Sequence, residues 1–510
     1  MNLPLRPLAA ACLVLLSFAA VAQAQDTFVA GQVTTREDGA PLPGAVVSLP
    51  ALNLSATTDQ EGRYRIAVPA GQAKGQMLEL RVTFAGLPTR TEQIRLSPGP
   101  IEHNVAIGLG FFEEVTVGSR MAGAAAERAV PVDVLTAAQI EATGHSETNQ
   151  VIQALAPSFN FPRPTITDGT DSVRPATLRG LGPDQVLVLI NGKRRHTGAL
   201  VHVNGSIGRG STGVDLNAIP ASAIQRIEIL RDGAAAQYGS DAIAGVINIV
   251  LKGGASPLTL SAKAGTTTHE DGELFDTSAS YGWNMGAGSF FATVEYRDRG
   301  ETNRAGPDPR DQIVAGDAGK NSVKQPNFHW GDSDARDIMT FANAAFPIGD
   351  AGTNSFYAFG GISRRLGSHG GFFRRAIQDT NWPQIYPQGY LPLIEPDVVD
   401  GSLTAGVRGV RSRWFWDLSA QYGHNSFDFN VRDSLNVSLG PNIPPNQTEF
   451  YSGSLVFDQI VTNLDLSRQI AIGLAKPVNF AIGAEYRREN YQIIAGEVNS
   501  YLDGGSPNRF

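Results

Sequence analysis

Residues 257–510 alternate between apolar side chains and small or polar ones, and this period of two constrains the fold more than any other feature. Strand-length runs such as "SFFATVEYRDR", "NSFYAFGGISRR" and "RWFWDLSAQYG" show the alternation. In the run "VNFAIGAEYRRENYQI" the two sets are Phe480, Ile482, Ala484 and Tyr486 against Asn479, Ala481, Gly483 and Glu485. Strands with one apolar and one polar face are typical of β-strands that cross a membrane.

Residues 1–24 have the pattern of a secretion signal peptide. They hold one basic residue, Arg6, then an apolar run, then the small-x-small cleavage site Ala22-Gln23-Ala24. Cys12 is the only cysteine and lies in the apolar run, so the mature chain is expected to use neither disulfides nor thiolate metal ligands. The rest of the sequence has no long apolar run, which leaves a β-barrel as the way to span a membrane.

Residues 27–108 predict a small all-β domain. Runs such as "FVAGQVTT", "GRYRIAVPA" and "MLELRVTFAG" are separated by turn residues, and their spacing suits a β-sandwich. The stretch from "GQVTTREDGAPLPG" to "DQEGRYRIAVPAG", with Asp59, Gly62 and Tyr64 at its turn, resembles the carboxypeptidase-regulatory-like domain, a transthyretin-like sandwich. That resemblance implies a non-catalytic appendage.

Residues 120–252 change to a mixed α/β pattern. A capping box from Thr136 to Gln139 predicts a helix, and a second helix is expected to start at Ser146 and to stop before Pro157. The run "DQVLVLINGKRR" predicts a strand that enters a turn at Asn191 and Gly192.

Three ordered stretches of this block resemble the plug domain of TonB-dependent outer-membrane receptors: "PVDVLTAAQIEATGHSETNQVIQALAP", "ATLRGLGPDQVLVLINGKRR" and "LNAIPASAIQRIEILRDGAAAQYGSDAIAGVINIVLK". Asp232-Gly233 departs from the Gly-Pro that the family often has. The resemblance implies a mainly β protein of the bacterial outer membrane: a periplasmic sandwich, an α/β plug and an antiparallel transmembrane β-barrel surrounded by outer-membrane lipid.

The predicted barrel is incomplete. Residues 257–510 offer about nine candidate strands, whereas plugged outer-membrane transporters have about 22. Phe510 looks like a terminal aromatic residue, but Gly504, Ser506 and Asn508 are not the apolar alternate residues of a final strand. We therefore expect the amino-terminal part of a barrel, from a longer receptor or an interrupted gene. Two polar segments, 299–335 and 365–400, predict extracellular loops.

Residues 111–119, "FFEEVTVGS", lie between the predicted sandwich and the predicted plug. In the resembled family this position holds the TonB box, which the resemblance assigns to Glu113, Glu114, Val115, Thr116 and Val117. The partner would be TonB, the energy-transducing protein of the inner membrane, and pairing would add a strand to the partner's sheet. The alternative is an ordinary last strand of the sandwich or first strand of the plug.

A basic cluster lies between Arg174 and Gly210. It has six basic residues and one acidic residue, Asp184, in a chain of formal net charge −8. Its candidate substrate-binding residues, on apical loops of the plug, are Arg194, Arg195, His196, His202 and Arg209. A basic surface attracts anionic ligands, but such arginines can instead pair with carboxylates of the barrel lumen. His196 and His202 lack a clear third ligand, so neither a metal nor a cofactor is predicted.

No catalytic motif is present: the sequence lacks Gly-x-Ser-x-Gly, His-Glu-x-x-His and a Gly-x-Gly-x-x-Gly after a strand. An acidic exported chain is also a poor nucleic-acid binder. The leading hypothesis is a receptor that binds a ferric siderophore or an oligosaccharide and imports it by plug rearrangement driven through the TonB box. The alternatives are a signalling receptor that uses its sandwich domain and an inert truncated fragment.

Overall fold

The computed structural model describes residues 27–35, 41–69, 71–84, 87–107, 132–203, 205–286, 288–317, 323–349, 354–412, 414–441, 447–470 and 478–506. The chain divides into two compact units, one built mainly from residues up to Ile107 and one mainly from the residues after it. Each unit is considered on its own.

The first unit is a β-sandwich of two sheets. The orders of the described strands are β4-β1-β7, with β8 also paired to β1, and β3-β2-β5-β6. Their bounds are β1 Phe28–Thr35, β2 Val46–Leu49, β3 Leu54–Thr57, β4 Arg63–Ala67, β5 Gln76–Phe84, β6 Leu87–Leu96, β7 Pro100–Glu102 and β8 Val105–Ile107, with a 3-10 turn η1 at Pro50–Leu52. On β5, Leu80 and Val82 are buried and Arg81 between them is exposed, as in a strand with one face toward a core.

The residues Asp59, Gly62 and Tyr64, at the turn before β4, each have a structural role. The Asp59 carboxylate accepts hydrogen bonds from the backbone N–H groups of Glu61 and Arg63, at 3.1 and 2.8 Å. Gly62 has φ +72°, and a Cβ there would meet the Val33 carbonyl oxygen at 2.5 Å. Tyr64 donates from its hydroxyl to the carbonyl oxygen of His103 at 2.8 Å. These contacts hold the turn and the start of β4 against β1 and against the segment between β7 and β8.

The second unit contains an α/β domain. Its described strands form a five-stranded sheet in the order β13-β12-β15-β14-β9, in which β12 and β15 are parallel. The strands are β9 Val132–Thr136, β10 Phe159–Asn160, β11 Thr177–Leu178, β12 Val186–Ile190, β13 Lys193–Arg194, β14 Ile224–Leu230 and β15 Gly245–Leu251. The helices are α1 Ala137–Ala142, α2 Thr148–Leu155 and α3 Ala235–Tyr238, with 3-10 turns η2 Pro183–Gln185, η3 Leu216–Ala218, η4 Ala221–Ala223 and η5 Ser240–Ala242.

The local predictions for this domain are largely confirmed. The capping box of Thr136 and Gln139 starts α1. Asn191 and Gly192 both have positive φ, 48° and 77°, as a two-residue hairpin turn requires. The predicted start of α2 was wrong by one residue, because Glu147 and not Ser146 is its N-cap. The Glu147 side chain makes no capping bond there.

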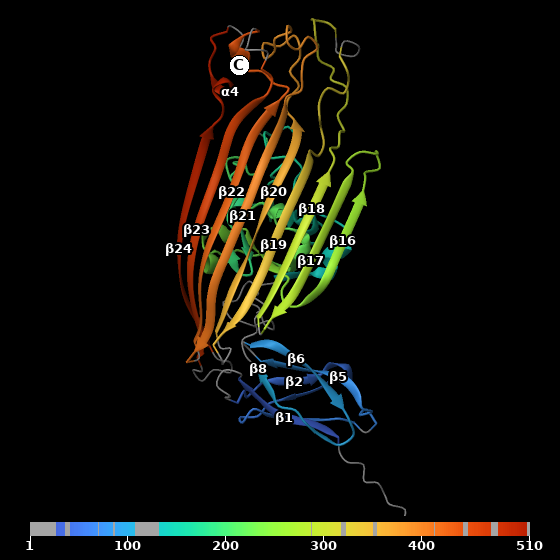
Figure 1. Ribbon diagram of the computed structural model, residues 1–510, viewed down its shortest axis with the longest axis vertical. Helices are drawn as coiled ribbons and strands as arrows, with labels where there is room; N and C mark the ends of the chain where they lie inside the picture. Colours follow the sequence, from blue (N-terminus) through green and yellow to red (C-terminus); the bar gives the residue numbers. More distant parts are fainter. Residues whose placement is uncertain are drawn as a thin grey trace, which may run out of the picture. The chain divides into compact units, whose positions relative to one another are not determined.

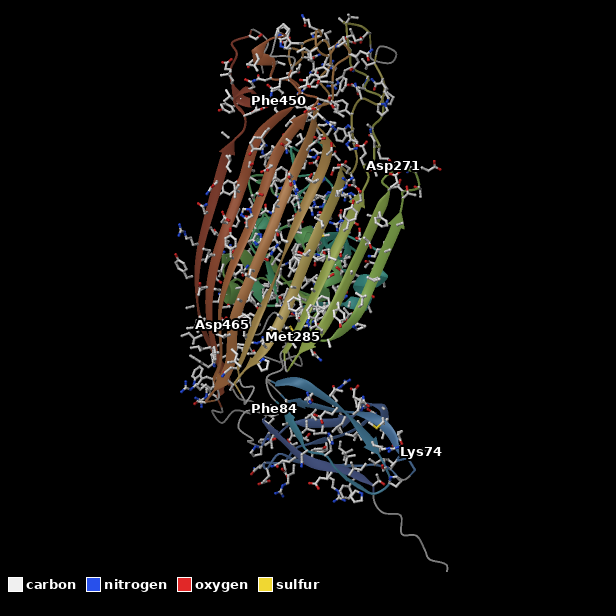
Figure 2. All side chains as sticks on the ribbon, in the orientation of Figure 1. Lys74, Phe84, Asp271, Met285, Phe450 and Asp465 are labelled. Atoms are coloured by element: carbon white, nitrogen blue, oxygen red, sulfur yellow. The ribbon has the colours of Figure 1, made fainter. Side chains whose placement is uncertain are left out.

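The rest of this unit is a large antiparallel sheet, followed by a short helix α4, Val498–Tyr501 (Figure 1). Nine of the described strands follow one another in it in chain order, from β16 to β24. They are β16 Ser256–Gly265, β17 Leu274–Met285, β18 Gly288–Arg299, β19 Asp334–Ile348, β20 Asn354–Gly370, β21 Leu393–Arg411, β22 Trp414–Arg432, β23 Phe450–Ile470 and β24 Val478–Ala495, with a 3-10 turn η6 at Val437–Leu439. Figure 2 places Met285 and Asp465 at the end with short connections, and Asp271 and Phe450 at the end with long loops.

The second predicted loop, 365–400, was too long. β20 continues to Gly370 and β21 begins at Leu393, which leaves 371–392 as the connection. Charged residues within 365–400 alternate between the two faces of these strands. Asp397 pairs with Arg364 on the outer face, while Arg365 faces inward and is buried. Polar composition therefore concealed the ends of two strands.

Candidate functional site

The α/β domain contacts the inner face of the large sheet through ion pairs. Lys193 of β13 places its Nζ 2.9 Å from Asp417 Oδ1 and 3.3 Å from Asp465 Oδ2. Tyr357 of β20 donates from its hydroxyl to Asp417 at 2.9 Å. The opposing carboxylates hold the pKa of the Lys193 ammonium above its ordinary value in spite of burial.

Arg194, a predicted substrate contact, pairs with acidic groups of both the α/β domain and the large sheet. Its guanidinium contacts Asp241 of the α/β domain and lies 3.5 Å from Glu485 Oε1 of β24. Arg487 of β24 reaches the same Asp241 carboxylate at 2.8 Å. Asp241 therefore joins the domain to the sheet through a shared carboxylate, and the arginines keep the pKa of Asp241 low in spite of partial burial.

Arg195 and His196 converge on one carboxylate of the sheet, Asp400 of β21. Arg195 donates to Asp400 and to Ser402, and His196 Nε2 lies 3.0 Å from Asp400 Oδ2. Asn425 of β22 donates to the same oxygen at 3.0 Å. The side chains of Arg195, His196 and Asp400 are 1%, 0% and 5% exposed. Burial and the neighbouring Arg195 lower the pKa of His196, which keeps the imidazole neutral near pH 7.

The two remaining predicted contacts lie in the loop after β13. His202 is buried, with Nδ1 3.4 Å from Thr170 Oγ1, and burial lowers its pKa to about 4. Arg209 is exposed. Lumen pairing, the alternative weighed for the arginines, describes the contacts of Arg194 and Arg195, whereas Arg209 is available to solvent. Binding of substrate by any of the five residues stays a prediction.

A second ionic network was not predicted from the sequence. The Glu147 carboxylate contacts Arg299 of β18 and lies 3.9 Å from Arg174 Nη1. Arg365 of β20 joins Asp215 of the α/β domain at 2.8 Å to Asp337 of β19 at 2.7 Å. Burial alone would raise the pKa of Glu147, but these guanidinium groups hold it well below its ordinary value. The available signal was charge at inward positions of β-strands, since a buried charge requires a partner.

Two other features bear on the type of site. Among the residues that the structure describes, no helix is both long and apolar enough to cross a membrane. In the same described ranges, no three His, Cys, Asp or Glu side chains gather where they could hold a metal ion. The predicted TonB box, Glu113 to Val117, lies outside the described residues.

An antiparallel sheet with an apolar outer face, ion-paired on its inner face to an α/β domain, defines the class of plugged outer-membrane β-barrel receptors. Residues 124–246 match the TonB-dependent receptor plug domain, and residues 29–108 match the carboxypeptidase regulatory-like domain. The chain therefore carries a TonB-dependent receptor plug domain joined to strands of the outer-membrane β-barrel type. The α/β domain is its plug and the large sheet belongs to its barrel wall.

Curated relatives include siderophore receptors. The ferric enterobactin receptor of Pseudomonas aeruginosa is 30% identical over 412 residues, which cover 79% of this chain and 52% of that protein. The probable TonB-dependent siderophore receptor PirA of Acinetobacter baumannii is 33% identical over 171 residues, 33% of this chain and 22% of that protein. This chain spans about half the length of the first of these and less of the second.

Solved structures show the same fold. A crystal structure of a ferric enterobactin receptor mutant from Pseudomonas aeruginosa, in complex with enterobactin, aligns with a TM-score of 0.53 at 17% identity. The alignment covers 71% of this chain and 49% of that one.

Proposed function

We propose that this chain acts in a TonB-dependent receptor that binds a ferric siderophore outside the cell and admits it to the periplasm when the plug rearranges. Support comes from the relatives named as siderophore receptors. Those relatives are named as receptors, and we propose the same role, rather than an enzymatic one, for this chain. The long-loop end of the barrel wall is the proposed extracellular end.

The ion-paired interface between plug and wall carries the proposal. Pairs that cross it are Lys193–Asp417, Arg194–Glu485, Arg195–Asp400, Glu147–Arg299 and Asp215–Arg365. Removing one partner of a buried pair costs about 3–5 kcal/mol, because an uncompensated charge stays buried. A plug held by several such pairs moves only when work is supplied.

The outer membrane holds neither ATP nor an ion gradient, so the work has to come from the inner membrane. A strand added to the sheet of TonB would transmit a pull through main-chain hydrogen bonds. We assign this role, pairing with TonB, to Glu113, Glu114, Val115, Thr116 and Val117.

Deleting residues 113–117 from the intact receptor tests the proposal. Uptake of a radiolabelled ferric siderophore is expected to be lost, while binding to the cell surface stays unchanged. Deleting residues 119–123 removes the same number of residues just before the range that matches the plug domain, and serves as the control. Uptake that survives the first deletion contradicts the role of the TonB box.

The substrate class is tested separately. Growth under iron limitation with single ferric siderophores is compared with growth on single glycans, in strains with and without the receptor. Receptor-dependent growth on a siderophore supports the proposed class. Receptor-dependent growth on a glycan alone would assign the receptor to oligosaccharide uptake.

A further inference from the structure

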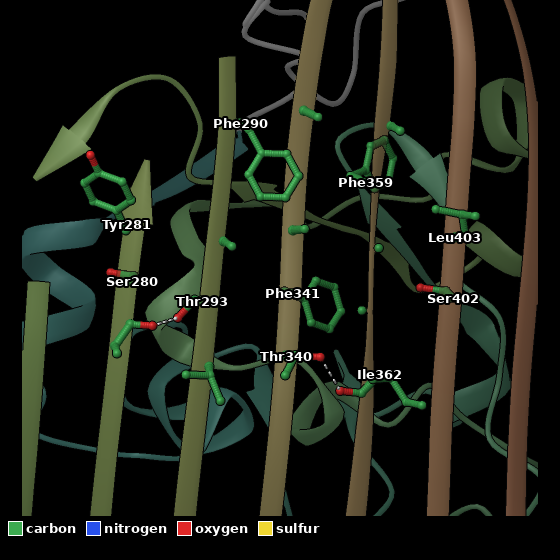
Figure 3. Close-up of a pocket in the computed structure, with 18 of the residues that line it drawn as sticks. Ser280, Tyr281, Phe290, Thr293, Thr340, Phe341, Phe359, Ile362, Ser402 and Leu403 are labelled. Atoms are coloured by element: carbon green, nitrogen blue, oxygen red, sulfur yellow. Dashed lines mark hydrogen bonds between the residues drawn. The ribbon is translucent and has the colours of Figure 1, made fainter. Parts of the chain in front are cut away.

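The outer face of the barrel wall contains a hollow of about 670 Å³ between β17 and β21 (Figure 3). The alternation along β20 identifies the face. Ile362 is 59% exposed and Phe356 is 37% exposed, whereas Tyr357 and Phe359 are buried. The hollow therefore lies on the side away from the plug, within the band that faces the membrane. Its volume falls in the roughly 300–1,000 Å³ of small-molecule pockets.

Small residues in register form the floor of this hollow. Ala292 of β18 lies opposite Ala342 of β19, and Ala342 lies opposite Gly360 of β20. The same cross-strand row ends at Tyr281 of β17 on one side and at Leu403 of β21 on the other. Figure 3 shows these two side chains at opposite ends of the hollow. The hollow thus runs across the strands.

The lining selects a hydrocarbon ligand. None of the lining residues is charged. The hydroxyl group of Thr340 donates to the Ile362 carbonyl oxygen at 3.4 Å, and the buried hydroxyl of Thr293 lies on the other face of the sheet, 2.9 Å from Ser222 Oγ of the plug. With those hydroxyls already paired and no ionic group present, a charged or strongly polar ligand would lose its own hydration without compensation.

We propose that the hollow seats an acyl chain of an outer-membrane lipid. It is continuous with the apolar membrane-facing surface, where Leu258, Ile338 and Leu418 are 61%, 53% and 45% exposed. Apolar surfaces gain little hydrophobic free energy by associating within lipid, so packing decides what fills a hollow. An unfilled hollow forfeits dispersion contacts along its lining, and a chain held between the two end walls regains them.

Electron spin resonance of a spin-labelled phospholipid in liposomes that contain the intact receptor tests this proposal. The motionally restricted fraction of the lipid is the readout. Ala342→Leu combined with Ala344→Leu fills the hollow with protein side chains and is expected to lower that fraction. Ala420→Leu adds the same side chain to an exposed position of β22 outside the hollow and is expected to leave the fraction unchanged.

A second pair of variants changes the volume in the opposite direction. Leu403→Ala removes an end wall and is expected to release the chain, while Leu418→Ala removes a similarly exposed leucine elsewhere on the same face. Both substitutions lie at exposed positions and are expected to fold. Equal restricted fractions in each variant and its control would overturn the proposal. Cross-linking between receptor copies is measured on the same variants. If the variants change cross-linking and leave the restricted fraction unchanged, the proposal is overturned, because a second copy of the receptor would then cover the hollow.

Discussion

The imidazole ring of His196 lies directly over Gly423 of β22, where the barrel wall presents no side chain. A Cβ at residue 423 would come within 2.4 Å of His196 Nδ1 and 2.5 Å of the ring Cγ. The space left by this glycine lets the histidine approach Asp400 on the neighbouring strand. Position and pairing of the plug therefore depend on a missing side chain as well as on opposite charges.

Gly423→Ala should loosen the plug. The added methyl group overpacks the His196 contact, at a cost of about 1–3 kcal/mol. Limited proteolysis of the plug in the intact receptor is expected to be faster than in the parent. Gly265→Ala is the control, because a Cβ there meets nothing within 4 Å. Equal cleavage rates for Gly423→Ala and the parent would contradict the prediction.

Asp400→Asn should destabilise the plug by about 3–5 kcal/mol, since Arg195 would stay buried without a counter-charge. Combining Asp400→Leu with Arg195→Met should cost less than the two changes summed, which a double-mutant cycle in denaturant measures. Asp133→Asn tests an exposed pair with Arg231 and should cost under about 1 kcal/mol. Additive effects of the two buried substitutions would show that the Arg195–Asp400 pair is not coupled.

Mild acid should weaken the plug through His202. Burial lowers the pKa of His202 from 6.5 to about 4, so the unfolded chain binds the proton more readily than the folded one. The stability that the neutral imidazole contributes is full above pH 6.5 and is lost as the pH falls toward 4. His202→Gln should therefore make the unfolding free energy fall less, or rise, relative to the parent as the pH is lowered from 7 to 5.

The variant has to be compared with the parent protein because a second buried group, Asp171, titrates in the same pH range. Burial raises the pKa of Asp171 to about 7, so Asp171 contributes stability at low pH that is lost as the pH rises. The two groups act in opposite directions over the same range. A slope unchanged by His202→Gln would contradict the assigned role of the histidine.

Arg209 is the predicted substrate contact that remains exposed, and a long-range electrostatic role is expected for it. Arg209→Ala should slow association of an anionic ferric siderophore, with the difference from the parent shrinking as salt is added. Arg209→Lys keeps the charge and should retain the parent rate. Stopped-flow fluorescence at two ionic strengths measures both, and an effect independent of salt would rule out steering.

Local features of this fold could be predicted from sequence because they depend on neighbouring residues. The alternation around Ile482, the capping box at Thr136 and the turn at Asn191 each need only a few adjacent positions. The ion pairs could not be predicted in the same way. Glu147 and Arg299, or Arg195 and Asp400, are far apart in the chain, and their contact depends on how the plug packs against the wall.

The charged residues were open to two interpretations in two places. Arg365 and Asp397 lie in the segment predicted as a loop, although both belong to strands. Arg194 and Arg195 suggested a surface for an anionic ligand, although each already contacts a carboxylate. A count of charges cannot separate a free cation from a paired one.

The arrangement of β9 has a mechanical consequence. Among the described strands β9 pairs with β14 alone, through five residue pairs from Val132–Leu230 to Thr136–Arg226. Tension applied at Val132 is therefore carried by a single ladder before it reaches α1. The rupture force of that ladder sets the largest tension at which β9 stays attached to the rest of the plug.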